Sequence, residues 1–330
     1  MSNTTNIATS SRLLVIIVNY RTANLTVNCL KSLSSEVQSL SGTQVVVVDN
    51  ASEDDSIQQI DMAIKTEGWE NWASLLTSDR NGGFAFGNNL VIRPALQSPH
   101  PPPYFLLLNP DTEVRSNALK ALLNFMELHS EVGIAGSSLE TADGTLWPIA
   151  FRFPSLLSEI DSGLRLGLVT QLLSNWVVPR KMGDQECQVD WLPGASMLIR
   201  REVFESVGLM DEQYFLYYEE TDFCLQARKA GWLCWYVPQS RVMHISGQST
   251  GVTAKDSQSK RLPKYWFDSR RRYFIKNHGV LYAALTDAVW IVSFALWRVR
   301  RLIQRKPDLD PPQLLRDFIL NSVFFQGIRV

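Results

Sequence analysis

The sequence lacks an excess of charge of either sign. Its 330 residues include 32 Lys and Arg against 33 Asp and Glu, which gives a formal net charge of −1. This balance provides no overall attraction to nucleic acid, so any charged partner has to be met by a local cluster. With 45% hydrophobic and 20% charged residues, the chain has the composition of an ordinary folded protein and is long enough to bury a substantial core.

Cysteine pairs, leader-like segments and repeats are also missing. The cysteines form no CxxC pair and no zinc-like group with histidines; they are Cys29, Cys187, Cys224 and Cys234. This pattern favours a reducing compartment. Residues 1–11 are polar and lack the order of a secretory signal, so we expect a flexible N-terminus and a cytoplasmic catalytic part. No GxGxxG motif follows the first apolar run, which argues against a dinucleotide fold.

The first half of the chain alternates between strand and helix patterns. Strands are predicted at 13–18, 45–48, around Leu75, at 104–108 and at 132–137, with helices near 25–33, 57–64, 84–96 and 117–129. Ser52 and Asp55 resemble a capping box before the second helix. The alternation predicts an open, mostly parallel α/β sheet.

The pattern is looser after a soft boundary near residue 140, although the two sides could form one domain. No order of elements can be assigned up to about residue 190. A strand at 195–199, a helix at 223–230 and a strand at 233–237 are then predicted.

Polar clusters follow the predicted strands at their carboxyl ends. Asn19 and Tyr20 follow the first strand, Asp49 and Asn50 the second, and Asn109 to Asp111 the strand at 104–108. Ligands bind at this edge of open α/β sheets, so a nucleotide site is predicted there. Simpler interpretations are that Asp49 caps a helix and that Asp111 is a charge near a helix N-terminus.

The segment 81–89 adds small residues and amides, which suit a backbone that approaches a ligand closely. Its glycine pair could alternatively form only a tight turn.

Several segments, taken in order, resemble glycosyltransferase family 2. They are Val18-Asn19-Tyr20, residues 48–52, residues 81–89, residues 108–111, residues 191–195, residues 218–224, Gly231-Trp232, and His244 with Gly247 and Ser249. The resemblance covers about residues 12–280 and is closest to bacterial rhamnosyltransferase-like members. It implies the GT-A fold, an α/β fold with an open, mostly parallel sheet flanked by helices, here with a C-terminal helical extension.

The resemblance also implies a division of labour along the chain. Residues 12–140 would be the nucleotide-sugar-binding half, 141–254 the acceptor and catalytic half, and 255–330 a basic and apolar helical extension. The implied activity is inverting transfer of a sugar, with rhamnose as one candidate. The donor would be a UDP- or dTDP-sugar, and the acceptor a saccharide or lipid-linked saccharide in surface polysaccharide synthesis.

Site residues follow from the same resemblance. Glu220 would be the general base, and Asp111 and His244 the ligands of a divalent cation, Mn²⁺ or Mg²⁺. The implied donor-binding residues are Asn19, Tyr20, Asp49, Asn50, Asn81, Gly83, Asn88 and Asn109. The implied acceptor-side residues are Trp191, Gly194, Glu219 and Asp222.

Two positions depart from the family pattern. Asn109 replaces the first carboxylate of the usual Asp-x-Asp pair, which predicts weaker metal binding. Glu220 stands where an Asp is usual; we expect the dipole of the helix that follows it to favour its ionised form. Alternatively, the acidic residues at 219–222 are a solvated helix start and His244 is a packed, hydrogen-bonded histidine.

The C-terminal segment combines cations, aromatics and an apolar run. Seven Lys and Arg lie between residues 260 and 276 among aromatic side chains, and residues 280–297 are apolar except for Asp287. A spanning helix needs about 20 apolar residues, so this run is marginal. We predict an interfacial helix and peripheral contact of residues 255–306 with the inner face of the membrane. A core helix or a homo-oligomer contact is the alternative.

Two other functions compete with sugar transfer. A nucleotidyltransferase that makes a nucleotide-sugar uses a similar sheet, but its glycine-rich loop with a basic residue after the first strand is missing. A catalytically inactive, saccharide-binding relative would explain Asn109 and Glu220.

Overall fold

The first half of the chain forms the predicted alternation. A computed structural model describes residues 11–147, 150–245 and 260–328. In order, its first elements are β1 (Leu13–Asn19), α1 (Ala23–Ser39), β2 (Thr43–Asp49), α2 (Ser56–Thr66), β3 (Ala73–Thr77), α3 (Gly83–Leu96), β4 (Tyr104–Leu108), β5 (Thr112–Val114), α4 (Ala118–Leu128) and β6 (Val132–Glu140). Runs of Val, Ile and Leu make β1, β2 and β4 almost wholly buried, as expected for parallel strands covered on both faces.

The second half completes the same sheet and adds a helical layer. Its elements are β7 (Ala150–Phe151), α5 (Leu156–Leu164), α6 (Gly167–Leu172), β8 (Pro179–Arg180), β9 (Cys187–Val189), β10 (Ser196–Arg200), α7 (Arg201–Val207), α8 (Glu219–Lys229) and β11 (Leu233–His244). The chain continues through α9 (Lys264–His278), α10 (Val280–Ile303), α11 (Leu314–Asn321) and α12 (Val323–Gln326).

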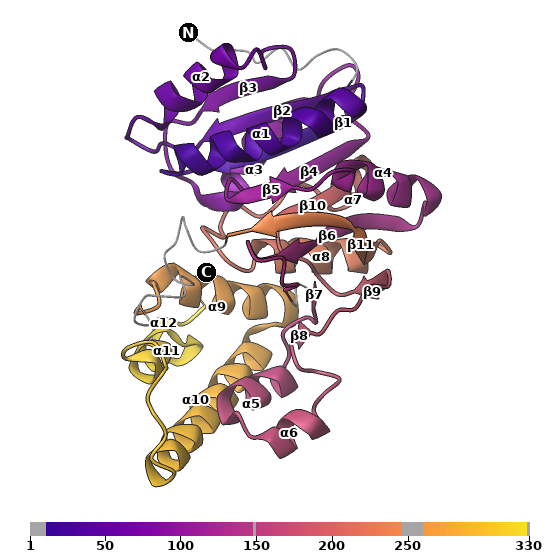
Figure 1. The fold of residues 1–330 in the computed structure, drawn as a ribbon. Helices are drawn as coiled ribbons and strands as arrows, with labels where there is room; N and C mark the ends of the chain where they lie inside the picture. The colour runs from indigo at the N-terminus through magenta and orange to yellow at the C-terminus, as the bar shows by residue number, and fades with distance from the viewer. Residues whose placement is uncertain (1–10, 148–149, 246–259, 329–330) are drawn as a thin grey trace.

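One continuous sheet joins the two halves (Figure 1). Its strand order is β3-β2-β1-β4-β10-β6-β11-β5, with β9 also paired to β11. Strands β3, β2, β1 and β4 are parallel, while β10 runs antiparallel between β4 and β6. Because β10 comes from beyond residue 140 and lies beside β4, the sheet has no break at the soft boundary.

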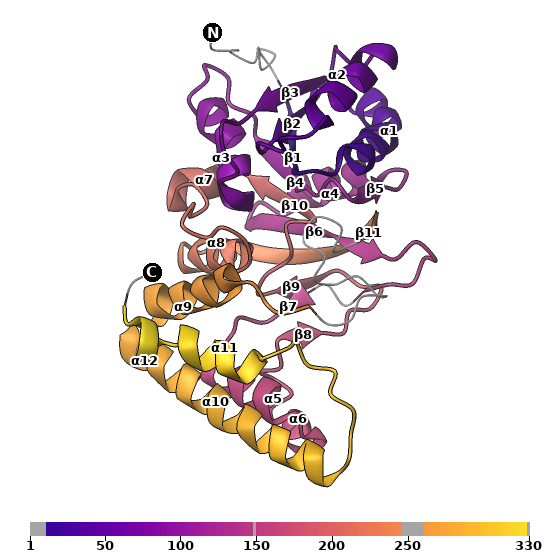
Figure 2. The ribbon, with the colours of Figure 1, turned by 90° about the vertical axis from the view of Figure 1, so that its left-hand side faces the viewer.

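The C-terminal helices pack below the sheet with α5 and α6 (Figure 2). Helices α5 and α10 lie so close that a Cβ on Gly163 would be 2.6 Å from the Cβ of Ser293. Asp287, which interrupts the apolar sequence of α10, is buried and pairs with Arg270 of α9. Arg270 also binds the buried Glu159 of α5 at 2.6 Å. This ion cluster fastens three helices together, and it explains a charge inside an apolar helix.

Three local expectations were wrong. Helix α2 begins at Ser56 rather than near Ser52, and it has no side-chain cap, because Ser52 instead bonds to Asp49. Asp111 precedes strand β5, so it is not a charge at a helix N-terminus. Helix α8 begins at Glu219, four residues earlier than predicted, which places Glu220 inside its first turn.

Candidate active site

The side chain of Asp49 is held by a closed set of hydrogen bonds at the end of β2. Its Oδ1 accepts from Asn19 Nδ2 at 2.7 Å and from Ser52 Oγ at 2.6 Å, and its Oδ2 accepts from the Ser52 backbone at 3.1 Å. Asn19 and Asp49 are fully buried register partners on β1 and β2. Asp49 does not cap α2. Asn19 therefore supports Asp49 rather than reaching outward, and Tyr20, next to it, carries the guanidinium of Arg21 over its ring at 5.1 Å.

The glycine-containing segment at α3 approaches the chain itself. Gly83 has φ +87°, and a Cβ there would lie 1.8 Å from the backbone oxygen of Phe215. Asn50 donates to Asn81 Oδ1 and to the Gly83 carbonyl, while Asn88 donates to Phe84. The close partner of this backbone is thus the loop before α8. The buried Oδ1 atoms of Asn50 and Asn88 have no hydrogen-bond partner among the described residues.

Gly194 connects this segment to Glu220. A Cβ on Gly194 would lie 2.5 Å from the ring of Phe84, so only glycine fits there. The Gly194 N–H donates to Glu220 Oε1 at 3.1 Å. The next residue, Ala195, accepts from the backbone N–H of Asn109 at 3.2 Å. Two consecutive residues therefore join the end of β4 to the first turn of α8.

Asp111 and His244 meet at the other side of this junction. His244 Nε2 lies 3.2 Å from Asp111 Oδ1 and 3.4 Å from Asn109 Nδ2. Residue pairing explains the meeting, because His244 ends β11 opposite Thr112 of β5. Trp147 packs edge-on against the His244 ring, with centroids 6.0 Å apart, and the buried His244 Nδ1 has no partner among the described residues.

This pair fits a divalent cation with few protein ligands. Within the described residues, no three His, Cys, Asp or Glu side chains form a metal-binding group. Asp111 Oδ1 and His244 Nε2 nevertheless present one oxygen and one nitrogen ligand within 3.2 Å of each other. A cation held by this pair would keep most of its coordination positions for other oxygen atoms. Asn109 beside it supplies an amide where a second carboxylate would add charge.

Burial shapes the chemistry of Glu219 and Glu220 more than the helix dipole does. Desolvation raises the pKa of Glu220 above the usual glutamate value, although backbone hydrogen bonds from Gly194 and from Glu220 itself oppose the shift. Desolvation also raises the pKa of Glu219 well above that value, and the charge of Glu220 adds to the effect. The expectation that the dipole of α8 favours ionised Glu220 was therefore wrong. Glu219 Oε2 has no partner among the described residues.

Asp222 is occupied by the C-terminal extension. Its Oδ2 pairs with Lys276 Nζ at 2.6 Å, and its Oδ1 accepts from Asn277 Nδ2 at 2.6 Å. Lys276 also binds Asp211, which lies before the loop that leads to α8. Helix α9 thus holds the helix turn that carries Glu220. Lys276 and Asn277 were not singled out from the sequence, because nothing in their local pattern shows that α9 returns to α8.

Trp191, predicted to lie on the acceptor side, packs against Phe151 next to the same junction. Its ring stacks on Phe151 with centroids 4.3 Å apart, and its Nε1–H donates to the carbonyl of Arg152. Trp191 is three residues before Gly194 and is only partly buried. Gly247 and Ser249, quoted with His244 in the motif, lie outside the described residues.

The model of the glycosyltransferase-like family 2 matches residues 11–261. The chain belongs to this family. The family 2 chain is 34% identical to the N-acetylglucosaminyl-diphospho-decaprenol L-rhamnosyltransferase of Mycobacterium tuberculosis, over 45% of this chain and 48% of that protein. The match thus spans about half of that relative. The predicted membership, with its resemblance to bacterial rhamnosyltransferases, is confirmed.

A second relative matches over most of its length. The family 2 chain is 28% identical to the low-salt glycan biosynthesis hexosyltransferase Agl10 of Haloferax volcanii, over 91% of this chain and 88% of that protein. Among solved structures, the mannosyltransferase PcManGT of Pyrobaculum calidifontis superposes with a TM-score of 0.51 at 12% identity. It covers 98% of this chain and 72% of its own, and it was solved in complex with GDP-Man and Mn²⁺. The GT-A fold is thereby confirmed.

Proposed function

We propose that the protein transfers a sugar with inversion from a UDP- or dTDP-sugar to a saccharide or lipid-linked saccharide in cell-surface polysaccharide synthesis. The observation that carries this proposal is the junction at Gly194 and Ala195. The Gly194 N–H donates to the side chain of Glu220, and the Ala195 carbonyl accepts from the N–H of Asn109, whose side chain lies beside His244. Rhamnose is our candidate sugar, because the mycobacterial relative is named as a rhamnosyltransferase.

Residues 12–140 supply the donor side. Asp49, fixed by Asn19 and Ser52, is a rigid acceptor suited to the N3–H of a uracil or thymine ring. Uracil and thymine present the same edge, so both nucleotides satisfy this contact. The buried Oδ1 atoms of Asn50 and Asn88, which have no partner among the described residues, would be the acceptors for ribose hydroxyls.

Asp111 and His244 would hold a divalent cation, Mn²⁺ or Mg²⁺. When bound, the cation would neutralise the charge that develops on the leaving nucleoside diphosphate. The His nitrogen favours Mn²⁺ over Mg²⁺. The complex of PcManGT with Mn²⁺ gives a precedent within the fold. Asn109 keeps the site less charged than a two-carboxylate site.

Glu220 would take the proton of the attacking acceptor hydroxyl. Inverting sugar transfer needs one carboxylate at the face opposite the leaving group. A raised pKa makes Glu220 a stronger base than an exposed glutamate. The Gly194 N–H orients Glu220 Oε1 and leaves Oε2 for the hydroxyl, while Trp191 offers an aromatic face to the acceptor sugar.

The exposed face of α10 would lie on the inner face of the membrane. This helix is long and apolar enough to span a bilayer, with 24 residues and a mean hydropathy of 1.7. One face of α10, however, packs on the rest of the protein, and Asp287 on this face pairs with Arg270 of α9. The opposite face exposes a stripe with spacings of three, four or seven residues, which correspond to one or two helical turns; it is formed by Leu281, Leu285, Val292, Leu296, Val299 and Ile303.

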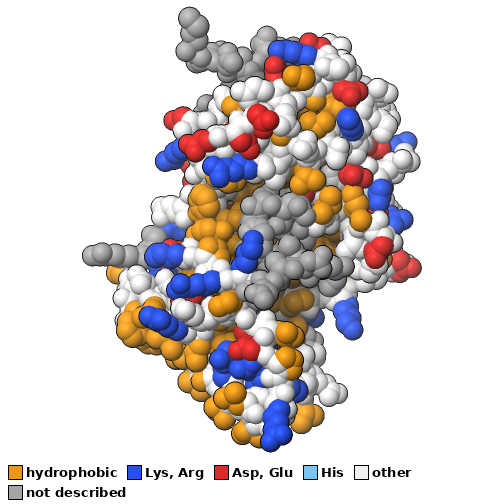
Figure 3. Space-filling view, turned by 60° about the vertical axis from the view of Figure 1, so that its left-hand side comes forward, with side chains coloured by type: hydrophobic (Ala, Val, Ile, Leu, Met, Phe, Trp, Pro, Cys, Tyr) orange, Lys and Arg blue, Asp and Glu red, His pale blue; other side chains and the backbone are white. Residues whose placement is uncertain are grey.

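Cations accompany this stripe, as contact with anionic headgroups requires. Figure 3 shows hydrophobic side chains gathered on the lower part of the molecule, with Lys and Arg among them. Arg305 and Lys306 are exposed beyond the end of α10. By contrast, most cations of residues 260–276 pair with carboxylates inside the protein, including Arg261 with Asp317 and Arg272 with Asp211. We therefore expect α10 and its C-terminal end, rather than residues 260–276, to contact the membrane.

A donor panel tests the function. UDP- and dTDP-sugars, each with and without Mn²⁺, would be scored for thermal stabilisation and for slow release of nucleoside diphosphate. We expect one nucleotide class to stabilise the protein in a metal-dependent way, by about 2.7 kcal/mol at a hundredfold excess over Kd. Pyrophosphate production would instead indicate a nucleotidyltransferase. Saccharide binding without any response to nucleotides would indicate an inactive relative.

A further inference from the structure

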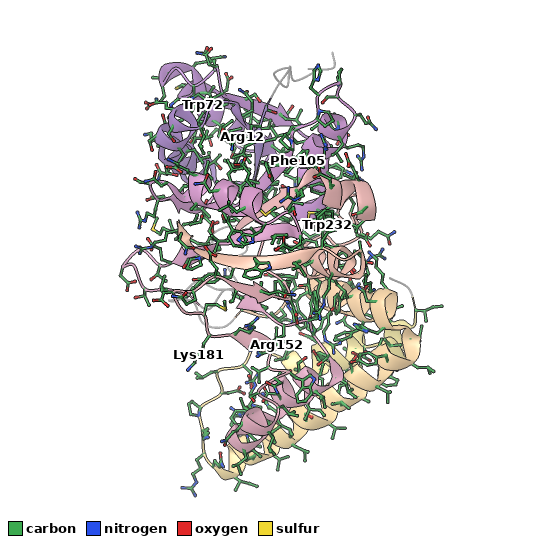
Figure 4. The ribbon with its side chains drawn as sticks, turned by 90° about the vertical axis from the view of Figure 1, so that its right-hand side faces the viewer. Arg12, Trp72, Phe105, Arg152, Lys181 and Trp232 are labelled. Atoms are coloured by element: carbon green, nitrogen blue, oxygen red, sulfur yellow. The ribbon has the colours of Figure 1, made fainter. Side chains whose placement is uncertain are left out.

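A second cluster of cations lies away from the Asp111–His244 pair, between the sheet and helices α5 and α6. Here a pocket with a volume of about 390 Å³ is lined by Arg152, Thr170, Ser174, Val177, Pro179, Arg180 and Lys181. Figure 4 labels Arg152 and Lys181, which lie at this level of the molecule, below the sheet.

The cations of the pocket are not neutralised by the protein. Arg152 Nη1 donates to the Val177 carbonyl and Arg180 Nη1 to the Gln188 carbonyl, so both guanidinium groups are held in place by uncharged acceptors. No carboxylate in the described part of the chain forms an ion pair with Arg152, Arg180 or Lys181. Two carboxylates bind neutral groups nearby: Asp161 accepts the hydroxyl of Thr170, and Asp190 accepts the backbone N–H of Phe153. Cations that share a pocket repel one another, and an anion would relieve that repulsion.

The pocket is connected directly to the acceptor side of the active site. The Arg152 carbonyl accepts from Trp191 Nε1, and the residue before Arg152, Phe151, exchanges two backbone hydrogen bonds with Trp191. From Trp191 the chain needs three residues to reach Gly194, which binds Glu220. Three residues span at most ~11 Å. A group bound in the pocket is therefore separated from the base by a distance that a short saccharide can bridge.

An exposed apolar surface lies on the other side of α6. Thr170 faces the pocket, whereas Leu168 and Leu172, two residues to either side, are 71% and 78% exposed. A helix is about 10 Å across, so the pocket and this apolar surface are separated by roughly one helix diameter. Helix α10, with its exposed stripe, packs in the same layer next to α5. A phosphate group in the pocket would thus lie close to the level of lipid headgroups.

We propose that this pocket binds the phosphate groups that join the acceptor saccharide to its lipid carrier. The proposal rests on the function proposed above and specifies its acceptor as a lipid-linked phosphate or diphosphate. Arg152, Arg180 and Lys181 hold the phosphate oxygens, the lipid chain leaves past Leu168 and Leu172, and the saccharide extends along Trp191 toward Glu220. Guanidinium groups suit this role because they form paired hydrogen bonds with phosphate.

Farnesyl diphosphate and farnesol are matched probes, since they share one prenyl chain and differ by the diphosphate. Binding would be measured by calorimetry in EDTA, so that no cation bridges the diphosphate to Asp111. We expect the protein to bind farnesyl diphosphate at least about tenfold more tightly than farnesol. The double variant Arg180→Gln/Lys181→Gln should lose that preference. The control Lys31→Gln/Lys120→Gln removes two exposed charges from α1 and α4 and should keep it.

Two further arms identify the source of the phosphate. Inorganic diphosphate tests for a free-anion site, and phosphatidylglycerol vesicles without acceptor test for a headgroup site. Equal affinity of the wild type and the double variant for farnesyl diphosphate would overturn the proposal. The proposal would also be overturned if the double variant lost its binding to phosphatidylglycerol vesicles as much as its binding to farnesyl diphosphate. Tighter binding of inorganic diphosphate than of farnesyl diphosphate would overturn it as well.

Donor hydrolysis, measured on the same preparations, separates this inference from the proposed function. The double variant should release nucleoside diphosphate from the donor as fast as the wild type does, because the pocket does not contact the donor side. One outcome would support the pocket but contradict the proposed sugar transfer. In that outcome, the wild type prefers farnesyl diphosphate to farnesol, the double variant loses this preference, and no preparation hydrolyses any donor.

Discussion

Two carboxylate sites at the same sheet are built in opposite ways. Asp49 accepts three hydrogen bonds from Asn19 and Ser52 and is fully buried. Glu220 accepts one side-chain hydrogen bond, from the Gly194 N–H, and the buried Oε2 of its neighbour Glu219 has none among the described residues. Burial raises the pKa of both glutamates.

The difference follows from what each group has to do. A carboxylate that recognises a nucleobase works best when its position and charge are fixed in advance, and hydrogen-bond donors do both. A general base has to gain a proton, so donors that stabilise its ionised form would weaken it. In this molecule, Asp49 is therefore suited to binding and Glu220 to proton transfer.

The largest expected effect comes from Glu220→Gln. The amide keeps the size of the side chain but cannot take a proton, so we expect kcat for transfer to fall by about 10²–10⁴-fold. Donor affinity and thermal stabilisation by donor should stay within about twofold. Steady-state kinetics and a thermal shift assay would check both. The control Glu205→Gln, on the surface of α7, should behave like the wild type; near-normal turnover of Glu220→Gln would place the base elsewhere.

Asp49→Asn should show the reverse pattern, with a smaller effect. Its amide would place a donor where the carboxylate accepts from Asn19 and Ser52, which should cost about 1–3 kcal/mol of unfolding free energy. The KM for the donor should rise by about 10–100-fold with kcat much less affected. Kinetics and chemical denaturation measure the two changes. Asp61→Asn, an exposed carboxylate on α2, is the control, and an unchanged donor KM would exclude Asp49 from base recognition.

The sequence predicted which polar residues gather at this edge of the sheet, because short-range rules govern their placement. The apolar runs of β1 and β4 are typical of buried strands. Polar residues directly after such strands gather at one edge of a parallel sheet. Asn19, Asp49 and Asp111 were found in this way. Their detailed roles were less accessible, since Asn19 supports Asp49 only because the two are register partners.

The rest of the site depends on contacts between residues far apart in the sequence, which local patterns do not predict. Gly83 has a positive φ and lies against the backbone of Phe215, more than a hundred residues later, and no local pattern shows that contact. The antiparallel placement of β10 between β4 and β6 brings Gly194 to Glu220, which depends on the whole sheet. The raised pKa of Glu220 likewise comes from burial, which overrides the local dipole argument.

A smaller effect is expected where α9 supports the base. Asp222→Asn removes the pairing with Lys276 and weakens the hold of α9 on the first turn of α8. We expect kcat to fall by about tenfold while the donor KM stays within about twofold, because a misplaced base slows the chemical step. Lys276→Arg keeps the charge and should retain most of the kcat.

Asp61→Asn, which breaks an exposed pair with Lys65 on α2, is the matched control for this positioning role. If Asp222→Asn lowers only the melting temperature and leaves kcat unchanged, Asp222 is structural and does not position Glu220. A parallel rise in donor KM would point to a general loss of the native state.

The smallest effect should come from Glu219→Gln, and it should depend on pH. Because the folded pKa of Glu219 is raised, the folded protein holds a proton that the unfolded chain releases, so the free energy of unfolding falls as pH rises above the usual glutamate value. Gln avoids this loss. We expect a higher melting temperature at neutral pH, by roughly 1–2 °C for each kcal/mol gained in a chain of this length, and no difference below the usual glutamate pKa. The acid limb of kcat/KM should stay where it is, because Glu219, whose pKa is raised further, is neutral in the pH range in which Glu220 titrates. The exposed Glu186→Gln is the control, and a melting temperature that rises equally at all pH values would show that packing, rather than the buried charge, is responsible.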